Sequence, residues 1–305
     1  QLRHSVAVVD TGSISRAAEK VCLTQPALTR SMQSLEDVLQ ARLLDRRPRG
    51  IVPTEAGRVL YDLATQIINE TQRAASDVAS IATGEKGHLH VGIAALFSNA
   101  LIDQIVVELV GRHPGLSIRI EEGYFEDLVS KLLVSELDVI LSNFPPGLMP
   151  DGIRLEPLLT LRSQFVAGRT HHLARKRKVT IADLHECQWA IINLPHVTEL
   201  LSGIFSNEGF PNVRHVIETN SLGVLINLVK TGKFVSLLPE HLFSGPNDTR
   251  SVKALHVTRT APILRRAGLI VREGGYQSPS LAKFLTVARE LCQRSSTQEY
   301  FGRLE

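Results

Sequence analysis

Residues 12–36 read GSISRAAEKVCLTQPALTRSMQSLE, a pattern typical of two short helices joined by a tight turn. Ser13 is placed to cap a helix over Ile14–Val21, because its hydroxyl can accept a hydrogen bond from a free backbone N–H of the first turn. Thr24 can cap the next helix in the same way, and Pro26 falls in that helix's first turn, where its missing N–H costs little. The segment therefore predicts a helix-turn-helix unit.

The second of these helices has an apolar face and a polar face. Small Ala17 and Ala18 in the preceding helix would let the two helices cross closely. The apolar positions recur at threes and fours and predict a buried face: Leu28, Met32, Leu35 and Leu39. The opposite face carries hydrogen-bonding side chains: Gln25, Thr29, Arg30, Gln33 and Ser34. A DNA recognition helix needs such groups on its N-terminal half.

A basic turn and a long helix follow. Arg42–Val52 includes the run Arg-Arg-Pro-Arg-Gly, whose proline and glycine predict a turn, so we interpret this segment as a two-stranded wing. Thr54 is placed to cap a helix of about 28 residues, whose narrow apolar stripe lies close to heptad spacing. We expect that stripe to form a helix–helix dimer seam. The polar, glycine-containing segment at 84–87 predicts a hinge.

The net charge is unevenly distributed. The chain has 305 residues, 34 Lys plus Arg and 31 Asp plus Glu, for a formal charge of +3. Residues 1–60 hold nine of the bases and six of the acids, and the other 245 residues hold 25 of each. The whole excess therefore lies on the helix-turn-helix segment. Clustered arginine is the footprint expected of phosphate contact.

Length and composition bound the class of protein. At roughly 150 residues per domain, 305 residues suggest about two domains. Cys22, Cys187 and Cys292 are far apart, which argues against a disulfide framework or a locally spaced zinc site. No apolar run approaches the ~20 residues that span a bilayer, and the first residues do not have the pattern of a signal peptide. We expect a cytoplasmic protein with no membrane partner.

The remainder of the chain alternates between strand and helix patterns, which indicates an α/β domain with a largely parallel sheet. Strands are predicted at 89–93, 116–120, 137–142, 165–167, 189–192, 213–218, 234–237 and 269–271. Helices are predicted at 100–110, 125–135, 181–184, 199–207, 222–231 and 280–293. Two sheet-like halves suggest two lobes around a cleft, the usual place for a small ligand.

Several motifs resemble those of one family. They are GSISRAAE at 12–19, LTQPALTR at 23–30, Leu35-Glu36, RLLDR at 42–46 and PTEAG at 53–57. Together they resemble the DNA-binding domain of LysR-type transcriptional regulators. Weaker likenesses follow at 111–114, 136–138, 229–232 and 237–239. Gln1 would fall inside the family's first helix, so a few residues are expected to precede it.

The resemblance implies a fold and its domain boundaries. It implies an N-terminal winged helix-turn-helix at 1–53, a linker and dimerisation helix at 54–83, a hinge at 84–87 and an effector-binding domain at 88–305. The last would have a two-lobed, type 2 periplasmic-binding-protein-like α/β fold. Its lobe I would cover about 88–161 and 267–305, and its lobe II about 162–266. The implied assembly is a dimer through the linker helix and commonly a homotetramer.

The resemblance also implies a DNA-reading surface. Carried onto this chain, the recognition-helix candidates are Gln25, Pro26, Thr29, Arg30 and Gln33. Glutamine can bond adenine and arginine can bond guanine, while threonine or proline can touch a thymine methyl. The candidates for phosphate or minor-groove contact by the wing are Arg46, Arg47, Arg49 and Thr54. Ser13 and Ser15 are further candidates for phosphate contact, with capping the preferred role for Ser13. The implied partner is double-stranded operator DNA.

Effector contacts are predicted from position at strand ends and helix starts. The candidates are Phe97, Ser98, Asn99, Tyr124, Phe125, Asn143, Thr198, Asn220 and Ser221. Helix N-termini that face a cleft can hold an anion, and effectors of the family are often small acids. Many relatives have serine or threonine where this chain has Ala94, Ala95 and Tyr124. That departure leaves a bulkier or aromatic effector as the alternative to an organic acid. Any of these residues can instead be a loop or cap residue.

Other chemistry has little support. His171-His172 can suggest metal or nucleic acid but also fits an exposed basic loop, and Cys187 can suggest a redox sensor but has no neighbouring cysteine. Nucleotide, hydrolase and zinc-protease motifs are missing. We predict an effector-controlled transcription regulator without cofactor, metal or catalytic residues, which would contact RNA polymerase if it is an activator. The alternative is a cytoplasmic small-molecule binding protein or enzyme with an incidental helical domain.

Overall fold

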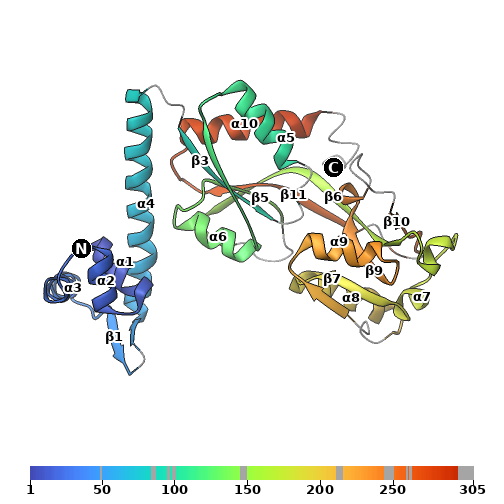
Figure 1. The fold of residues 1–305 in the computed structure, drawn as a ribbon, viewed down its shortest axis with the longest axis horizontal. Helices are drawn as coiled ribbons and strands as arrows, with labels where there is room; N and C mark the ends of the chain where they lie inside the picture. The colour runs from blue at the N-terminus through green and yellow to red at the C-terminus, as the bar shows by residue number, and fades with distance from the viewer. Residues whose placement is uncertain are drawn as a thin grey trace. The chain divides into compact units, whose positions relative to one another are not determined.

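The computed structural model describes residues 1–48, 50–83, 87–94, 97, 101–144, 150–210, 216–243, 251–258, 260 and 263–294. The chain forms two compact units (Figure 1). The first comprises Gln1–His90 with Gly115–Arg119 and Glu126–Asp138, and the second comprises the remaining residues. Each is described by itself below.

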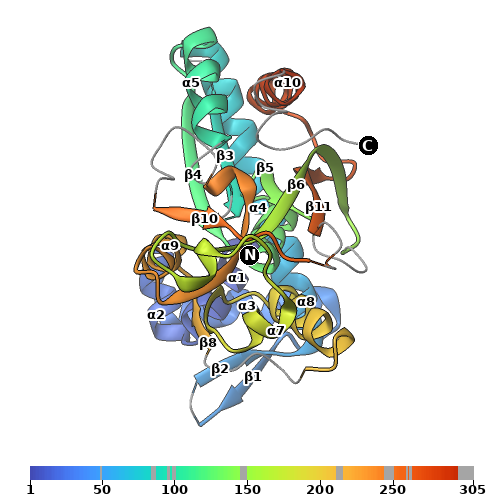
Figure 2. The same cartoon turned by 90° about the vertical axis from the view of Figure 1, so that its right-hand side faces the viewer.

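The first unit begins with three helices and a two-stranded wing. The helices are α1 (Leu2–Thr11), α2 (Ile14–Lys20) and α3 (Gln25–Leu39), followed by β1 (Leu44–Arg47), β2 (Gly50–Pro53) and α4 (Glu55–Thr83). Strands β1 and β2 pair antiparallel as a hairpin, visible in Figure 2. One buried cluster joins the three helices and the wing base: Ala7, Val8, Ala17, Ala18, Leu28, Met32, Leu35 and Leu43. The predicted winged helix-turn-helix is confirmed.

Local chemistry sets the ends of these helices. Gly12 ends α1 with φ of 60°, a left-handed conformation that glycine adopts without steric cost. Ser13 then caps α2, its hydroxyl accepting from the Arg16 N–H at 3.5 Å, and Thr24 caps α3 by accepting from the Ala27 N–H at 3.4 Å. The two caps fix where α2 and α3 begin, and the turn between the helices ends at Thr24. This is the arrangement predicted from the residue types.

Helix α4 is a single uninterrupted helix of 29 residues (Figure 1). The Thr54 hydroxyl caps it by accepting from the Gly57 N–H at 3.0 Å. Four large apolar side chains on α4 remain between half and two-thirds exposed: Val59, Leu63, Ile67 and Val78. Exposed aliphatic residues at this spacing form a stripe with no partner in the described chain. No described helix is long and apolar enough to cross a bilayer.

The α/β part of the chain is built on one mixed sheet. Its described strands are β3 (His88–Ala94), β4 (Ser117–Gly123), β5 (Val139–Asn143), β6 (Ile153–Gly168), β7 (Gln188–Ile192), β8 (Val216–Thr219), β9 (Phe234–Pro239), β10 (Val252–Ala254) and β11 (Ile263–Arg272). The strand order is β4-β3-β5-β11-β6-β9-β7-β8, with β10 paired to β6. The helical elements are α5 (Ile102–Arg112), α6 (Phe125–Leu133), η2 (His172–Arg175), α7 (Ile181–His185), α8 (Pro195–Asn207), α9 (Leu222–Lys230), η3 (Glu240–Leu242) and α10 (Pro279–Gln293).

The prediction of a largely parallel sheet was wrong for the middle of the sheet. β3 pairs parallel with β5, and β7 pairs parallel with β8 and β9. β11 and β6, however, run antiparallel to each other and to their outer neighbours β5 and β9. These two strands connect a group formed by β4, β3 and β5 to a group formed by β9, β7 and β8. Sequence reasoning detected only their buried ends, because charged residues at 154, 156, 162, 265 and 266 hide the strand pattern.

The second strand group has a core on each face. Phe165, Trp189 and Phe205 belong to one cluster, with Trp189 packed edge-on against both phenyl rings, and helices α7 and α8 cover this side. Val166 and Ala190 point to the other side and pack under α9. Successive residues of one strand enter opposite clusters because side chains alternate across a sheet.

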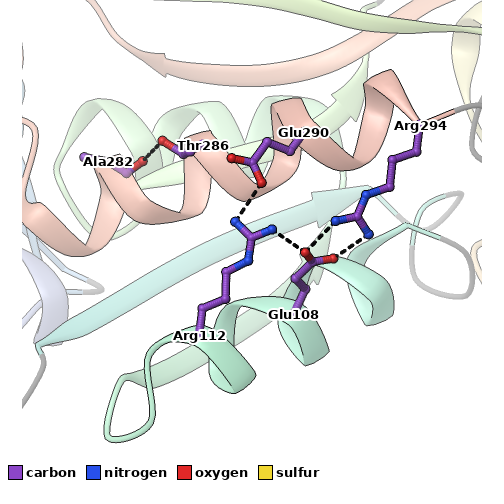
Figure 3. A network of polar contacts seen from close by, with 6 residues as sticks. All are labelled: Glu108, Arg112, Ala282, Thr286, Glu290 and Arg294. Carbon is purple, nitrogen blue, oxygen red and sulfur yellow. Dashed lines mark hydrogen bonds and ion pairs between the residues drawn. The ribbon is translucent and has the colours of Figure 1, made fainter.

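Helices α5 and α10 are joined by an ionic network (Figure 3). Arg112 pairs with Glu108 on its own helix and with Glu290 of α10 at 2.6 Å. Arg294 reaches back to Glu108 with two bonds of 2.8 and 2.6 Å, and this pairing lowers the pKa of the Glu108 carboxyl. The network sets how the two helices align, although exposed ion pairs contribute little stability.

Candidate DNA-binding surface and effector site

The recognition-helix candidates lie on the side of α3 that faces away from the core. Gln25, Pro26, Arg30 and Gln33 are exposed. Thr29 is half-buried, and its hydroxyl donates to the Gln25 backbone carbonyl at 2.9 Å. Leu28 and Met32, on the opposite side of the same helix, are buried. One helix therefore combines a buried anchor with a polar surface.

Three hydroxyl candidates take part in local hydrogen bonds. The Ser15 hydroxyl donates to the Gln25 side-chain oxygen at 3.4 Å, which brings α2 and α3 together at the start of the recognition helix. The Ser13 hydroxyl caps α2. The Thr54 hydroxyl caps α4 and also donates to the Arg42 carbonyl at 2.7 Å. The structure thus gives Ser13 and Thr54 structural bonds besides any contact with DNA.

The wing exposes arginine side chains, and a backbone hydrogen bond attaches the wing to the helices. Arg46 and Arg47 are exposed on β1, while Arg49 lies outside the described residues. The Ile51 N–H donates to the Gly12 carbonyl at 3.0 Å, so the wing is joined to the turn between α1 and α2. Gly50 has φ of 127°, and a Cβ there would lie 2.8 Å from the same carbonyl oxygen. The close approach requires glycine at this position.

Glu36 holds the wing to α3, a role that sequence reasoning missed. One of its carboxylate oxygens accepts from the Leu43 N–H at 2.7 Å and the Leu44 N–H at 3.3 Å. The residue was noticed only as part of a motif. An acidic side chain in the second half of a helix, where the helix dipole disfavours negative charge, was the signal available.

Some of the effector candidates near β3, β4 and β5 lie among the described residues and others do not. Phe97 is fully buried, and its ring stacks on His241 with centroids 6.3 Å apart. Asn143 is buried at the end of β5, and Tyr124 and Phe125 are half-buried. Ser98 and Asn99 lie outside the described residues. His241, in η3 directly after β9, is an addition that sequence reasoning did not select, because it becomes adjacent to Phe97 only through the fold.

The remaining candidates lie at helix starts. Thr198 and Asn220 are exposed. Ser221 caps α9, because its hydroxyl accepts from the Val224 N–H at 3.4 Å while its own N–H donates to the Thr219 hydroxyl at 3.1 Å. The structure therefore gives Ser221 a capping bond, the alternative role named above for such residues.

The histidine pair is locally structural. His171 is buried, and its ring nitrogen accepts from the Leu173 N–H at 3.2 Å, while its ring stacks on His172 at 4.4 Å. Burial and the neighbouring His172 lower the pKa of His171. Among the described residues, no group of three or more potential metal ligands exists.

The cysteines are expected to differ sharply in reactivity. Burial raises the pKa of the Cys187 thiol to about 11 and that of Cys292 to about 12, whereas Cys22 is exposed. Since the thiolate is the reactive form, a chromogenic disulfide reagent at pH 8 should modify Cys22 rapidly in the native protein. Cys187 and Cys292 should react only after denaturation. Rapid modification of more than one thiol in the folded chain would contradict this assignment.

Comparison with known proteins gives two domain matches. Residues 1–58 match the family described as "Bacterial regulatory helix-turn-helix protein, lysR family", and residues 82–293 match the "LysR substrate binding domain". The SDS degradation transcriptional activation protein of Pseudomonas sp. (strain ATCC 19151) is 28% identical over 92% of each chain. The RuBisCO operon transcriptional regulator of Allochromatium vinosum is 26% identical over 93% of each.

Solved structures share the fold. CbnR, a LysR family transcriptional regulator, matches over 96% of this chain and 99% of its own with a TM-score of 0.68 and 22% identity. Full-length CbnR complexed with its target DNA matches over 95% and 98% with a TM-score of 0.66 and 20% identity. The relatives are transcriptional regulators, not enzymes. With both of its domains matched, this chain belongs to the LysR family of transcriptional regulators, in which a DNA-binding helix-turn-helix is joined to an effector-binding domain.

Proposed function

We propose that the chain reads a partly palindromic operator as a dimer, with α3 in the major groove and the wing on the backbone or in the minor groove. The main support is the exposed set Gln25, Arg30 and Gln33 on α3, held by a buried opposite face. Exposed Arg46 and Arg47 on the wing supply charge for phosphate or minor-groove contact. The whole positive excess of the chain lies in the same segment.

The test of this proposal is selection of binding sites from random duplex DNA by the full chain, followed by gel-shift assays at several salt concentrations. We expect an enriched site with two related half-sites and an affinity that falls steeply as salt rises. Uniform binding to all duplexes, or none, would overturn the proposal.

We propose that α4 forms the dimer seam through the exposed stripe Val59, Leu63, Ile67 and Val78. Pairing two such stripes would bury apolar surface, and each Å² removed from water stabilises the dimer by about 25 cal/mol. The double change Leu63→Asp with Ile67→Asp should therefore convert the dimer to monomer at micromolar concentration, as measured by sedimentation. Val224→Asp, at an equally exposed valine on α9, is the matched control and should leave the assembly unchanged. A dimer that persists in the double variant would contradict the seam.

A second pairing surface would produce the tetramer. Val107 and Val110 on α5 are exposed together with Ile120 on β4, which is the edge strand of the sheet. Exposed apolar residues beside an unpaired strand edge favour pairing with another copy. We propose that this surface joins two dimers in the cytoplasm. We also propose that the protein contacts RNA polymerase if it is an activator.

We propose that a small effector binds between the two lobes, near the buried Phe97–His241 stack, with Asn143 and Tyr124 as further contacts. An aromatic effector would suit the stacked rings and an organic acid would suit the helix starts. Screening both classes by thermal shift tests this, since a ligand of the folded state raises its stability. A true effector must also change operator affinity, because it acts only by binding two arrangements unequally.

A further inference from the structure

A separate cavity lies within the first unit, between the helix-turn-helix and α4. It has a volume of about 430 Å³, and its walls come from α1, α2, α4 and the turn after α6. Arg3, Asp10, Lys20, Tyr61 and Glu136 supply its polar lining. The volume falls in the range of about 300–1,000 Å³ found for small-molecule sites. None of these residues belongs to the proposed DNA surface or to the effector candidates.

Two of the charged groups that line this cavity, one cation and one anion, have no ion-pair partner in the described part of the chain. Asp10 is satisfied, because its two oxygens accept from the Lys20 ammonium at 2.8 Å and from the Tyr61 hydroxyl at 2.7 Å. Within the described part of the chain, the Arg3 guanidinium and the Glu136 carboxylate make no ion pair. The cavity therefore offers opposite free charges on two different elements.

A buried hydroxyl adds an unmet hydrogen-bonding group. Thr65 lines the cavity and is only 9% exposed, and its hydroxyl oxygen has no partner among the described residues. Leaving such a group unpaired is unfavourable, so a ligand that bonds to it gains stability. Asn69, one turn further along α4, donates its amide to the Val134 carbonyl at 2.7 Å, which leaves its side-chain oxygen as an acceptor. The rest of the wall consists of polar Gln72 and an apolar part formed by Val6, Ala7, Val21 and Ile68.

The surroundings of Tyr61 show that this region is partly desolvated and negative. Burial, the hydrogen bond to Asp10 and the nearby charges of Asp10, Glu136 and Asp62 raise the pKa of Tyr61 to about 12. The influence of Glu136 on this phenol also places the carboxylate close to α4. Such an environment favours a cationic group beside Glu136.

The cavity lies away from the proposed dimer seam. Successive residues of an α-helix advance by about 100°, so Thr65 and Gln72, which line the cavity, lie on the side of α4 opposite Leu63 and Ile67. Pairing through the exposed stripe would therefore leave the cavity open.

We propose that this cavity is a second ligand site that binds a small zwitterion of the α-amino acid class, with its ammonium group at Glu136 and its carboxylate at Arg3. The apolar wall would take the side chain, and the Thr65 hydroxyl and the Asn69 carbonyl would complete the polar contacts. Bound there, the ligand would tie the turn after α6 to the helix-turn-helix. It would reinforce the existing contacts of α4 with that turn, among them the Arg73–Asp138 ion pair at 2.7 Å.

The test is calorimetric titration of the full chain with each of the twenty standard L-α-amino acids. At least one should bind, and Arg3→Gln and Glu136→Gln should each weaken that binding at least tenfold. Glu19→Gln, which removes an exposed carboxylate of α2 outside the cavity, is the matched control and should change nothing. The amide and the N-acetyl derivative of the same amino acid should also bind at least tenfold more weakly to the unaltered protein.

A further variant guards against misfolding. Thr65→Val removes the unpaired hydroxyl at nearly constant shape, so it should keep or raise the melting temperature while it weakens amino-acid binding. The proposal is overturned if no amino acid binds, or if the affinity stays within twofold in both Arg3→Gln and Glu136→Gln, which would place the ligand elsewhere. Operator binding, measured separately by gel shift, reports on the proposed function and not on this site.

Discussion

The substitution Gly57→Ala is expected to destabilise the DNA-binding head by about 2 kcal/mol or more and to abolish operator binding. A Cβ at this position would lie 2.0 Å from the Leu43 carbonyl oxygen and 3.2 Å from the Pro53 side chain. The Leu43 oxygen cannot withdraw without cost, because it accepts from the Thr54 N–H at 2.9 Å and Leu43 is buried in the head's core. Overpacking of this kind costs about 1–3 kcal/mol, occasionally more.

The direction of this effect opposes helix propensity. Gly57 lies in the first turn of α4, and alanine is normally favoured over glycine within a helix by up to about 1 kcal/mol. The clash outweighs that gain because the contact is with backbone. Thermal unfolding followed by circular dichroism should show the transition of the head lowered by at least about 5 °C. Gel shift should show the loss of operator binding.

Gly203→Ala is the matched control. Gly203 lies within α8, and a Cβ there would meet nothing within 4 Å. The higher helix propensity of alanine should then determine the stability, and the variant should be as stable as the parent or slightly more stable. Equal melting temperatures for Gly57→Ala and the parent protein would show that the head tolerates the clash and would refute the prediction.

The substitution Arg30→Ala is expected to remove sequence-specific binding while the fold remains intact. Arg30 is exposed on α3, on the side away from the buried Leu28 and Met32. Loss of a bidentate contact to guanine costs about 1–3 kcal/mol, and a dimer loses two such contacts. The combined loss of about 2–6 kcal/mol means that the specific affinity should be weaker by a factor of between about 30 and more than about 10,000.

Arg47→Ala provides the contrast. As a wing residue proposed to contact phosphate, it should weaken binding to all sequences about equally and reduce the salt dependence. Gel-shift titrations with the selected operator and with unrelated duplex distinguish the two effects. An Arg30→Ala protein that still binds its operator at the parental level would exclude Arg30 from base recognition.

Local chemistry explains why the head could be predicted. Ser13, Thr24 and Thr54 act as caps in the structure, as their residue types and positions predicted. The buried face of α3 follows from Leu28, Met32 and Leu35, spaced as helix geometry requires. All these interactions join residues a few positions apart, so the necessary information lies in short segments.

The sequence alone thus determined the helix-turn-helix, the long α4 and the alternating α/β order, because caps and hydrophobic periods act over one or two turns. The tertiary structure decided the rest. The antiparallel central strands β6 and β11, the Phe97–His241 stack, the Glu36 bonds to the wing and the cavity lined by Arg3 and Glu136 all bring together residues from separate segments. Such contacts depend on how whole elements pack against one another, and no local residue pattern records that packing.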